Sequence, residues 1–275
     1  MRAEPLNLRE TQLESLRILR LFDEICSELN LSYWLMYGSL IGAIRHNGFI
    51  PWDDDLDVGM PRDDFNKLID FFDKNSSKCL PFVLINYDGS RREVPFLIAR
   101  LSNTEFKQIG EYGFALQEMG TFIDIYPFDG MGDNQKEAYK FKKRCESHVK
   151  DYMDTCYFKM GNKLKDPLRF LKKKIKSKMI GPSSLHLKRL TDELETYSYA
   201  NSTYVGNCTW NYGFPNDFYR REDFDEVIRI QFEDFSAPVP IGFDRVLATC
   251  YGDYMQLPPE EERIGHHYYS IVRRA

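Results

Sequence analysis

The sequence predicts an α/β protein of the α+β kind, with a mixed sheet core, flanking helices and a helical insertion. Short apolar runs typical of strands alternate with helical patterns in the first half of the chain. A long polar stretch with helical periodicity separates them from further strand-like runs near the C-terminus. With 275 residues, 43% of them hydrophobic, the chain is long enough to bury a substantial core.

The first half begins with a helix and continues with short strands. Asn7 and Glu10 have the spacing of a capping box, and apolar residues at helical spacing extend this helix to about Leu29. A strand at 32–37 and a short helix at 39–46 follow, then further strands at 55–58, 82–87, 96–101, 106–109 and 122–126, with a helix opened by Pro61.

The second half is helical before it returns to strands. Residues 136–199 are polar and rich in Lys, Arg and Glu, with few turn signals. A strand at 227–232, a turn near Ser236 and a helix at 243–251 come after them. We therefore divide the chain into a core at 1–135, a helical basic subdomain at 136–200, and a C-terminal part at 201–275 that completes the core.

Charge and composition exclude several classes of protein. The net charge of −5 provides no global basic field of the kind that attracts nucleic acid, so we expect no nucleic-acid partner. Because no apolar run has the length of a signal peptide core or a membrane span, we expect a cytoplasmic protein. The six cysteines are widely spaced and form no C-x-x-C pair, which indicates reduced thiols.

One basic segment contrasts with the acidic remainder. Residues 163–178 contain eight Lys or Arg and one acid, a local charge of +7 that leaves −12 for the rest of the chain. Apolar residues recur at helical spacing opposite these lysines: Leu164, Leu168, Leu171, Ile175 and Met179. The pattern is typical of an interfacial helix, and a solvated helix packed on the globule would look the same. Peripheral membrane contact through residues 163–179, at the inner face of the cell membrane, is one hypothesis.

Three short patterns carry the candidate chemistry. Gly38 and Ser39 lie between a strand and a helix, where backbone N–H groups and a hydroxyl can approach a phosphate. Asp55 and Asp57 alternate along a predicted strand, so both carboxylates face the same way. Asp124 lies between two isoleucines on a later strand. Three carboxylates suit one or two Mg²⁺ ions, or Mn²⁺, shared with substrate phosphates.

These patterns together resemble the nucleotidyltransferase fold, and a longer stretch resembles the LicD family. That stretch is Y-G-S-L-I-G-A-I-R-H-N-G-F-I-P-W-D-D-D-L-D-V-G-M-P-R, residues 37–62. The runs at 122–127 and 251–255, with Pro258 and Pro259, also fit the family. LicD-like proteins include bacterial phosphocholine transferases and, more distantly, fukutin-type phosphoribitol transferases. The stretch from 136 to 199 matches only loosely.

The resemblance implies a catalytic core that transfers phosphocholine from CDP-choline to a sugar hydroxyl and releases CMP. The acceptor would be a lipid-linked, cell-surface glycan precursor of the teichoic-acid or lipopolysaccharide type. Asp55 and Asp57 would hold the metal, with Asp124 as the third carboxylate. Further candidates for the donor are Arg45, His46, Arg62 and His267, since an Arg fork suits phosphate. Phosphoribitol transfer and nucleotidyl transfer remain open as competing reactions, as does a non-catalytic binding module.

Several residues have competing interpretations. His46 is either a phosphate contact or a turn residue packed against Trp52, and Asp53 is expected to be a solvated or capping acid. An EF-hand at 53–64 is rejected because its Gly lies one position late and position twelve is not Glu. A zinc site could be formed by Cys145, His148, Cys156 and Cys208, although buried thiols are the favoured interpretation. The candidates for contact with choline are Trp34, Trp52, Trp210 and Tyr212.

Overall fold

The computed structural model describes residues 4–86, 96–110, 119–160, 167–210, 217–265 and 269–274. The helices are α1 (Leu8–Glu28), α2 (Tyr37–Ile41), α3 (Arg62–Asn75), α4 (Gln135–Met160), α5 (Pro167–Ile180), α6 (Ser183–Leu194) and α7 (Phe243–Tyr251). The strands are β1 (Trp34–Leu35), β2 (Asp57–Pro61), β3 (Phe82–Ile85), β4 (Ala99–Asn103), β5 (Phe106–Gly110), β6 (Thr121–Gly130), β7 (Tyr204–Asn207), β8 (Tyr219–Arg220), β9 (Val227–Phe232), β10 (Phe235–Pro240) and β11 (Tyr269–Arg273). A π-helical turn, Gly42–His46, continues α2, and 3₁₀ turns occupy Arg221–Phe224 and Glu260–Glu262.

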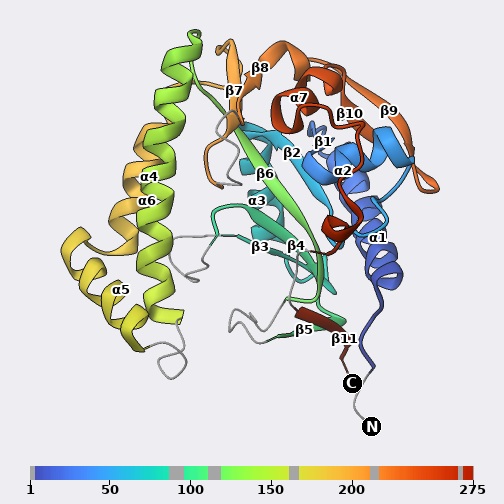
Figure 1. Ribbon diagram of the computed structural model, residues 1–275, viewed down its shortest axis with the longest axis horizontal. Coiled ribbons are helices and arrows are strands. Elements are labelled where there is room, and N and C mark those ends of the chain that lie inside the picture. Colours follow the sequence, from blue (N-terminus) through green and yellow to red (C-terminus); the bar gives the residue numbers. More distant parts are fainter. Residues whose placement is uncertain are drawn as a thin grey trace.

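A mixed sheet forms the centre of the molecule (Figure 1). Its strand order is β1-β2-β6-β4-β3, and β7 extends it by pairing with the end of β6 and with β8. Strand β2 runs parallel to β6, whereas β4 and β7 run antiparallel to it. All ten residues of β6 are buried, as a central strand covered on both faces requires. The predicted α+β class with a mixed sheet is confirmed.

Helix α1 begins at the predicted capping box and covers part of this sheet. The Asn7 side chain accepts a hydrogen bond from the Glu10 backbone N–H at 2.9 Å, and the Glu10 carboxylate accepts one from the Asn7 N–H at 2.7 Å. These two hydrogen bonds pair backbone N–H groups that have no acceptor within the helix at its first turn. The apolar side of the helix, including Leu19 and Phe22, is fully buried.

Helices α4, α5 and α6 lie together at one flank of the sheet (Figure 1). A second apolar cluster, separate from the main core, joins α4 and α6 to β7 and includes Phe141 and Tyr152 of α4 and Leu190 of α6. None of the described helices combines the length and the apolar composition that crossing a membrane requires.

Several predicted boundaries are wrong by a few residues. Strand β2 begins at Asp57, two residues later than predicted, and the turn between β9 and β10 lies at Glu233 (φ 57°) instead of near Ser236. Strands β7, β8, β10 and β11 lie outside the predicted strands. Strand β11 pairs antiparallel with β5 and so returns the C-terminal segment to the first half of the chain.

Candidate active site

The parallel pairing of β2 with β6 brings two of the predicted acids together. Asp57 is the register partner of Asp124. Directly paired residues of adjacent strands lie roughly 5 Å apart and point to the same face of the sheet. Asp57 and Asp124 therefore share one face of the sheet, as expected for the predicted site, although they lie far apart in the sequence.

Like Asp124, Asp57 is deeply buried. It is 4% exposed, and its Oδ1 atom has no hydrogen-bond partner among the described residues. The Tyr126 hydroxyl donates to its carboxylate. Burial raises the pKa of Asp57 well above its usual range, and the nearby charges of Asp55, Asp124 and Asp53 raise it further. A buried carboxylate oxygen left unpaired is costly, so a cation is the natural partner for it.

Asp53 and Asp55 form a second part of the acidic cluster. Asp55 precedes β2 instead of lying in it, which corrects the predicted strand, yet it remains the strongest charged neighbour of Asp57. Asp53 is hydrogen-bonded to Asp55, and burial together with that neighbour raises the pKa of Asp53 to about 9. The expectation that Asp53 is a solvated or capping acid is therefore wrong.

Asp124 is bound by an arginine that no sequence pattern indicated. Arg100, on β4, donates from Nε and Nη2 to the two carboxylate oxygens at 2.6 and 3.2 Å. Its guanidinium carbon lies 4.5 Å from the ring centroids of both Phe96 and Phe122. Burial lowers the pKa of Arg100, but Asp124 more than offsets this, and the pKa is raised. Two aromatic faces and a bidentate partner thus fix this positive charge beside the acids.

The acidic cluster suits a hard divalent cation in charge and in donor type. Asp53, Asp55, Asp57 and Asp124 carry −4 if all are ionised, and Arg100 returns only one positive charge. Among the described residues, no three carboxylates, imidazoles or thiolates form a ready-made metal site. However, the unpaired Oδ1 of Asp57 and the adjacent Asp55 are the oxygen ligands that Mg²⁺ prefers. These two residues would hold the ion.

The Gly38–Ser39 turn, predicted as a phosphate contact, packs directly against the acids. A Cβ atom at Gly38 would lie 2.7 Å from Oδ2 of Asp53, so glycine permits the close approach of this acid. The Ser39 Oγ accepts a hydrogen bond from the Asp57 backbone N–H at 2.8 Å. Ser39 is 3% exposed. Both residues therefore position the acids within the protein.

Tyr37, immediately before this turn, begins a buried polar network. It adopts a left-handed backbone conformation with φ 50°, which is unfavourable for a residue other than glycine. Its hydroxyl donates to Asp217 at 3.0 Å, as does the hydroxyl of Tyr219 at 2.7 Å. Lys142 of α4 reaches the same carboxylate at 3.5 Å. The network connects the turn at the acids with the helical flank.

Arg45 and His46, both predicted as donor contacts, make contacts within the protein. Arg45 Nη1 donates to the backbone oxygens of Tyr254 (2.6 Å) and Gln256 (3.2 Å). The rings of His46 and Trp52 meet edge to face at 6.2 Å, which agrees with the packing interpretation of His46. Burial and the Arg45 charge lower the pKa of His46. Arg45 therefore anchors the turn to the C-terminal segment.

Arg62, predicted as a donor contact, lies at the opposite end of β2 from Asp57. It follows β2, about 16 Å along the strand from Asp57 at the usual rise per residue. There it donates to both carboxylate oxygens of Asp129 at 2.7 and 2.9 Å. Its guanidinium is thus held by a buried carboxylate partner.

The C-terminal segment contributes two tyrosines that were not among the predicted site residues. Tyr251 lies near Asp57 and Asp53, and Tyr269 lies near Arg100 and the other acids, since these groups shift the pKa values of their hydroxyls. Burial is the main cause, and it raises both pKa values well above the usual range. The family-like run at 251–255 is a signal for Tyr251; no pattern indicates Tyr269. His267 lies outside the described residues.

The structure describes some of the residues predicted to bind choline or zinc. Trp34 is 1% exposed and packs between Phe128 and Phe224, so it cannot contact a substrate. The ring of Trp52 faces Arg263 at 5.6 Å, while Tyr212 lies outside the described residues. Cys145 and Cys208 are buried free thiols within hydrogen-bond reach of each other, as the favoured interpretation expects.

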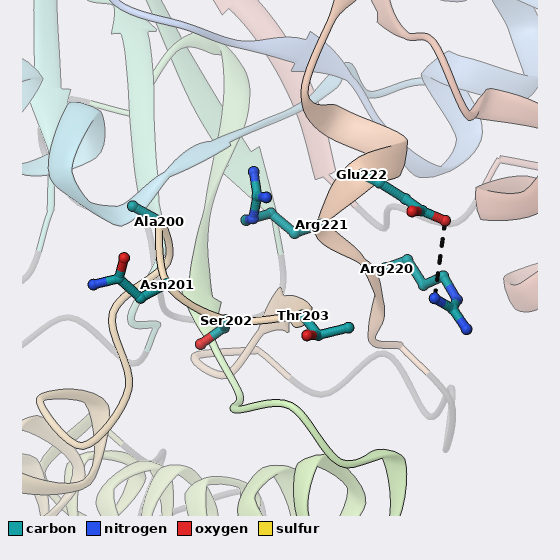
Figure 2. A pocket seen from close by; sticks show the side chains of 7 residues that line it. All are labelled: Ala200, Asn201, Ser202, Thr203, Arg220, Arg221 and Glu222. Atoms are coloured by element: carbon teal, nitrogen blue, oxygen red, sulfur yellow. Dashed lines mark ion pairs between the residues drawn. The ribbon is translucent and has the colours of Figure 1, made fainter.

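Two hollows lie near the β7–β8 edge, away from the acidic cluster. One, of about 270 Å³, lies between residues 200–203 and 220–222 (Figure 2). Its arginines already face acids, Arg220 at 4.0 Å from Glu222 and Arg221 with Asp225. The other, of about 540 Å³, is lined mainly by β8, α7 and their neighbours. Neither is lined by a predicted site residue, so we assign no ligand to them.

Comparison with known proteins shows similarity to a relative over nearly the full length of the chain. A family model described as the LicD/FKTN/FKRP nucleotidyltransferase domain matches residues 30–163. The chain is 31% identical over 273 residues to the lipopolysaccharide cholinephosphotransferase LicD of Haemophilus influenzae, a match that covers 95% of this chain and 96% of that protein. It is 56% identical to the ribitol 5-phosphate transferase FKRP of Mus musculus, but over only 32 residues, 12% of this chain and 6% of that protein.

Proposed function

Because this chain belongs to the LicD family, we propose that it is a phosphotransferase that moves phosphocholine from CDP-choline to a hydroxyl of a cell-surface glycan precursor, with release of CMP. The observation that carries the proposal is the buried Asp57 with its unpaired oxygen, placed beside Asp124 by strand register. The nearly full-length relative that is named for cholinephosphate transfer supports choline as the group moved.

The acids would act through a divalent cation, Mg²⁺ or Mn²⁺, held by Asp55 and Asp57. When bound, this ion would neutralise charge on the phosphoryl oxygens and on the leaving CMP. Tyr126 and Ser39 hold Asp57 in place from its carboxylate and from its backbone N–H. Arg100 orients Asp124 through two hydrogen bonds to its carboxylate. The protein thus supplies a fixed set of oxygens to a flexible substrate.

The acceptor is proposed to be a lipid-linked glycan precursor of lipopolysaccharide or teichoic-acid type. The acceptor in the name of the Haemophilus relative, a lipopolysaccharide, supports the first of these. The reaction would then take place on the cytoplasmic side, where nucleotide-linked donors are made.

A second candidate reaction has the same mechanism but transfers a different phospho-alcohol. The local match to a ribitol 5-phosphate transferase favours phosphoribitol over any other CDP-linked alcohol. It covers little of the chain, whereas the cholinephosphotransferase covers nearly all of it, so choline remains the first proposal.

The test compares donors under one set of conditions. Purified protein, Mg²⁺ and choline-free lipopolysaccharide are incubated with CDP-choline, CDP-ribitol or CTP, and CMP, pyrophosphate and the modified glycan are measured. We expect CMP and choline-bearing glycan from CDP-choline alone. CMP from CDP-ribitol alone would establish the second candidate, and pyrophosphate from CTP would show nucleotidyl transfer instead.

A further inference from the structure

Four large apolar side chains are exposed on the same face of helix α5. Leu168 is 72% exposed, Leu171 and Ile175 are each 51% exposed, and Met179 is 80% exposed. Single exposed apolar residues are common, but four on one short helix form a continuous patch. This patch is not used by the acidic cluster or by the core.

The helix geometry places lysines on both sides of this apolar stripe. At 3.6 residues per turn, the four apolar residues fall within an arc of about 80°. Lys172 borders one side of the arc, and Lys174 and Lys178 border the other. All three lysines are exposed, and they form no ion pair with any other described residue. These three lysines therefore flank the stripe instead of lying opposite it.

An ion pair fixes the orientation of this face. Lys176 of α5 contacts Asp154 at 2.6 Å and Asp151 at 3.3 Å, both on α4. Figure 1 shows α5 beside α4 and far from the sheet. Because α4 holds one side of the helix, the apolar stripe with its lysines stays directed outward.

We propose that this face of α5 binds the surface of an anionic lipid bilayer. Leucine, isoleucine and methionine would enter the acyl boundary, while the flanking lysines extend to the phosphate groups. The charge of +7 at 163–178 against −12 elsewhere makes this segment the part that an anionic surface attracts. A bilayer offers acyl chains to the apolar stripe and phosphate groups to the lysines on both sides of it. A protein groove would need acidic residues along both of its rims to do the same. The proposal goes beyond the transfer reaction and does not depend on it.

The test is flotation of the intact protein with vesicles. Vesicles of phosphatidylcholine alone are compared with vesicles that also contain phosphatidylglycerol, at low and high salt. We expect flotation with the anionic vesicles and its loss at high salt. Replacing Lys172, Lys174 and Lys178 together with Gln should weaken binding roughly a hundredfold, at about fivefold per lysine. The double variant Leu171→Gln, Ile175→Gln should lose a similar amount.

Matched controls test whether the α5 face itself is responsible. Leu13→Gln replaces an exposed apolar residue of α1, and Lys136→Gln with Lys140→Gln removes exposed lysines of α4. These variants should float like the unmodified protein, and circular dichroism should show all variants folded. Absence of flotation, equal flotation of the stripe variant, or equal loss in the controls would overturn the proposal. So would a dimer that dissociates in the stripe variant while the unmodified protein ignores vesicles.

Discussion

The two ends of the β2–β6 strand pair carry similar residues but differ in how their charges are satisfied. At the amino end of β2, Asp57 lies beside Asp124 with one buried oxygen unpaired and several acids close by. At the other end, Arg62 and Asp129 form a closed bidentate pair at 2.7 and 2.9 Å. We call the Asp57 end incomplete, because a buried oxygen there lacks a partner, and the Arg62 end complete, because its charges pair with each other. Incomplete clusters mark places where a ligand supplies the missing partner.

The largest expected effect follows from removing the charge at the incomplete end. Asp57→Asn keeps the shape of the side chain but removes an oxygen ligand for a divalent cation. We expect transfer to fall roughly a thousandfold, about 4 kcal/mol, because this ion neutralises the phosphoryl charge. Folding stability should not decrease, since one buried like charge has gone. The measurement is CMP release together with urea unfolding. Asp70→Asn, on exposed α3, is the control. Turnover within tenfold of the unmodified protein would contradict this role.

The complete end should respond in the opposite way. Arg62→Met leaves Asp129, which is 2% exposed, buried without its cation. Stability should fall by about 3 kcal/mol, while turnover per folded molecule changes little. Urea unfolding and active-site-normalised kinetics measure both quantities. A raised KM for the donor at unchanged stability would instead restore Arg62 to the donor site.

Arg100 tests how far the acidic end depends on its one positive neighbour. Arg100→Lys keeps the charge but loses the bidentate contact with Asp124 and the stacking on Phe96 and Phe122. We expect kcat to fall roughly tenfold, with a smaller change in stability. If Lys supported full turnover, the orientation of Asp124 would not matter to the reaction.

Ser39 should show the smallest effect. Ser39→Ala removes the acceptor for the Asp57 backbone N–H and should cost about 1 kcal/mol of stability. Donor KM should stay nearly constant, because Ser39 is buried and holds the strand. A large rise in donor KM with constant stability would support the original phosphate-binding prediction.

The sequence predicts the acids but not what surrounds them. Asp55, Asp57 and Asp124 follow from short patterns and a long family-like stretch, since strands and turns leave local signals. Arg100 could not be found in this way, because it meets Asp124 only through the antiparallel pairing of β4 with β6. No local sequence pattern predicts such long-range strand pairing.

Arg62 and Asp53 show how much depends on the distances between elements. Arg62 closes the family-like stretch and looks like a phosphate ligand, but five strand residues carry it away from the acids. Asp53 looks like one more solvated acid in a run, yet Gly38 leaves room for its carboxylate against the turn. In both cases the deciding quantity is a distance between elements, which residue type and spacing alone do not determine.

The most direct test of the central claim is Mn²⁺ binding measured by the loss of the free-ion electron paramagnetic resonance signal. The account predicts saturable binding by the unmodified protein and by Asp70→Asn, and its loss in Asp57→Asn. It also predicts that folded Arg62→Met protein still binds the ion, because its change lies at the other end of the strand pair. Equal binding by Asp57→Asn and the unmodified protein, or no binding by either, would contradict the claim.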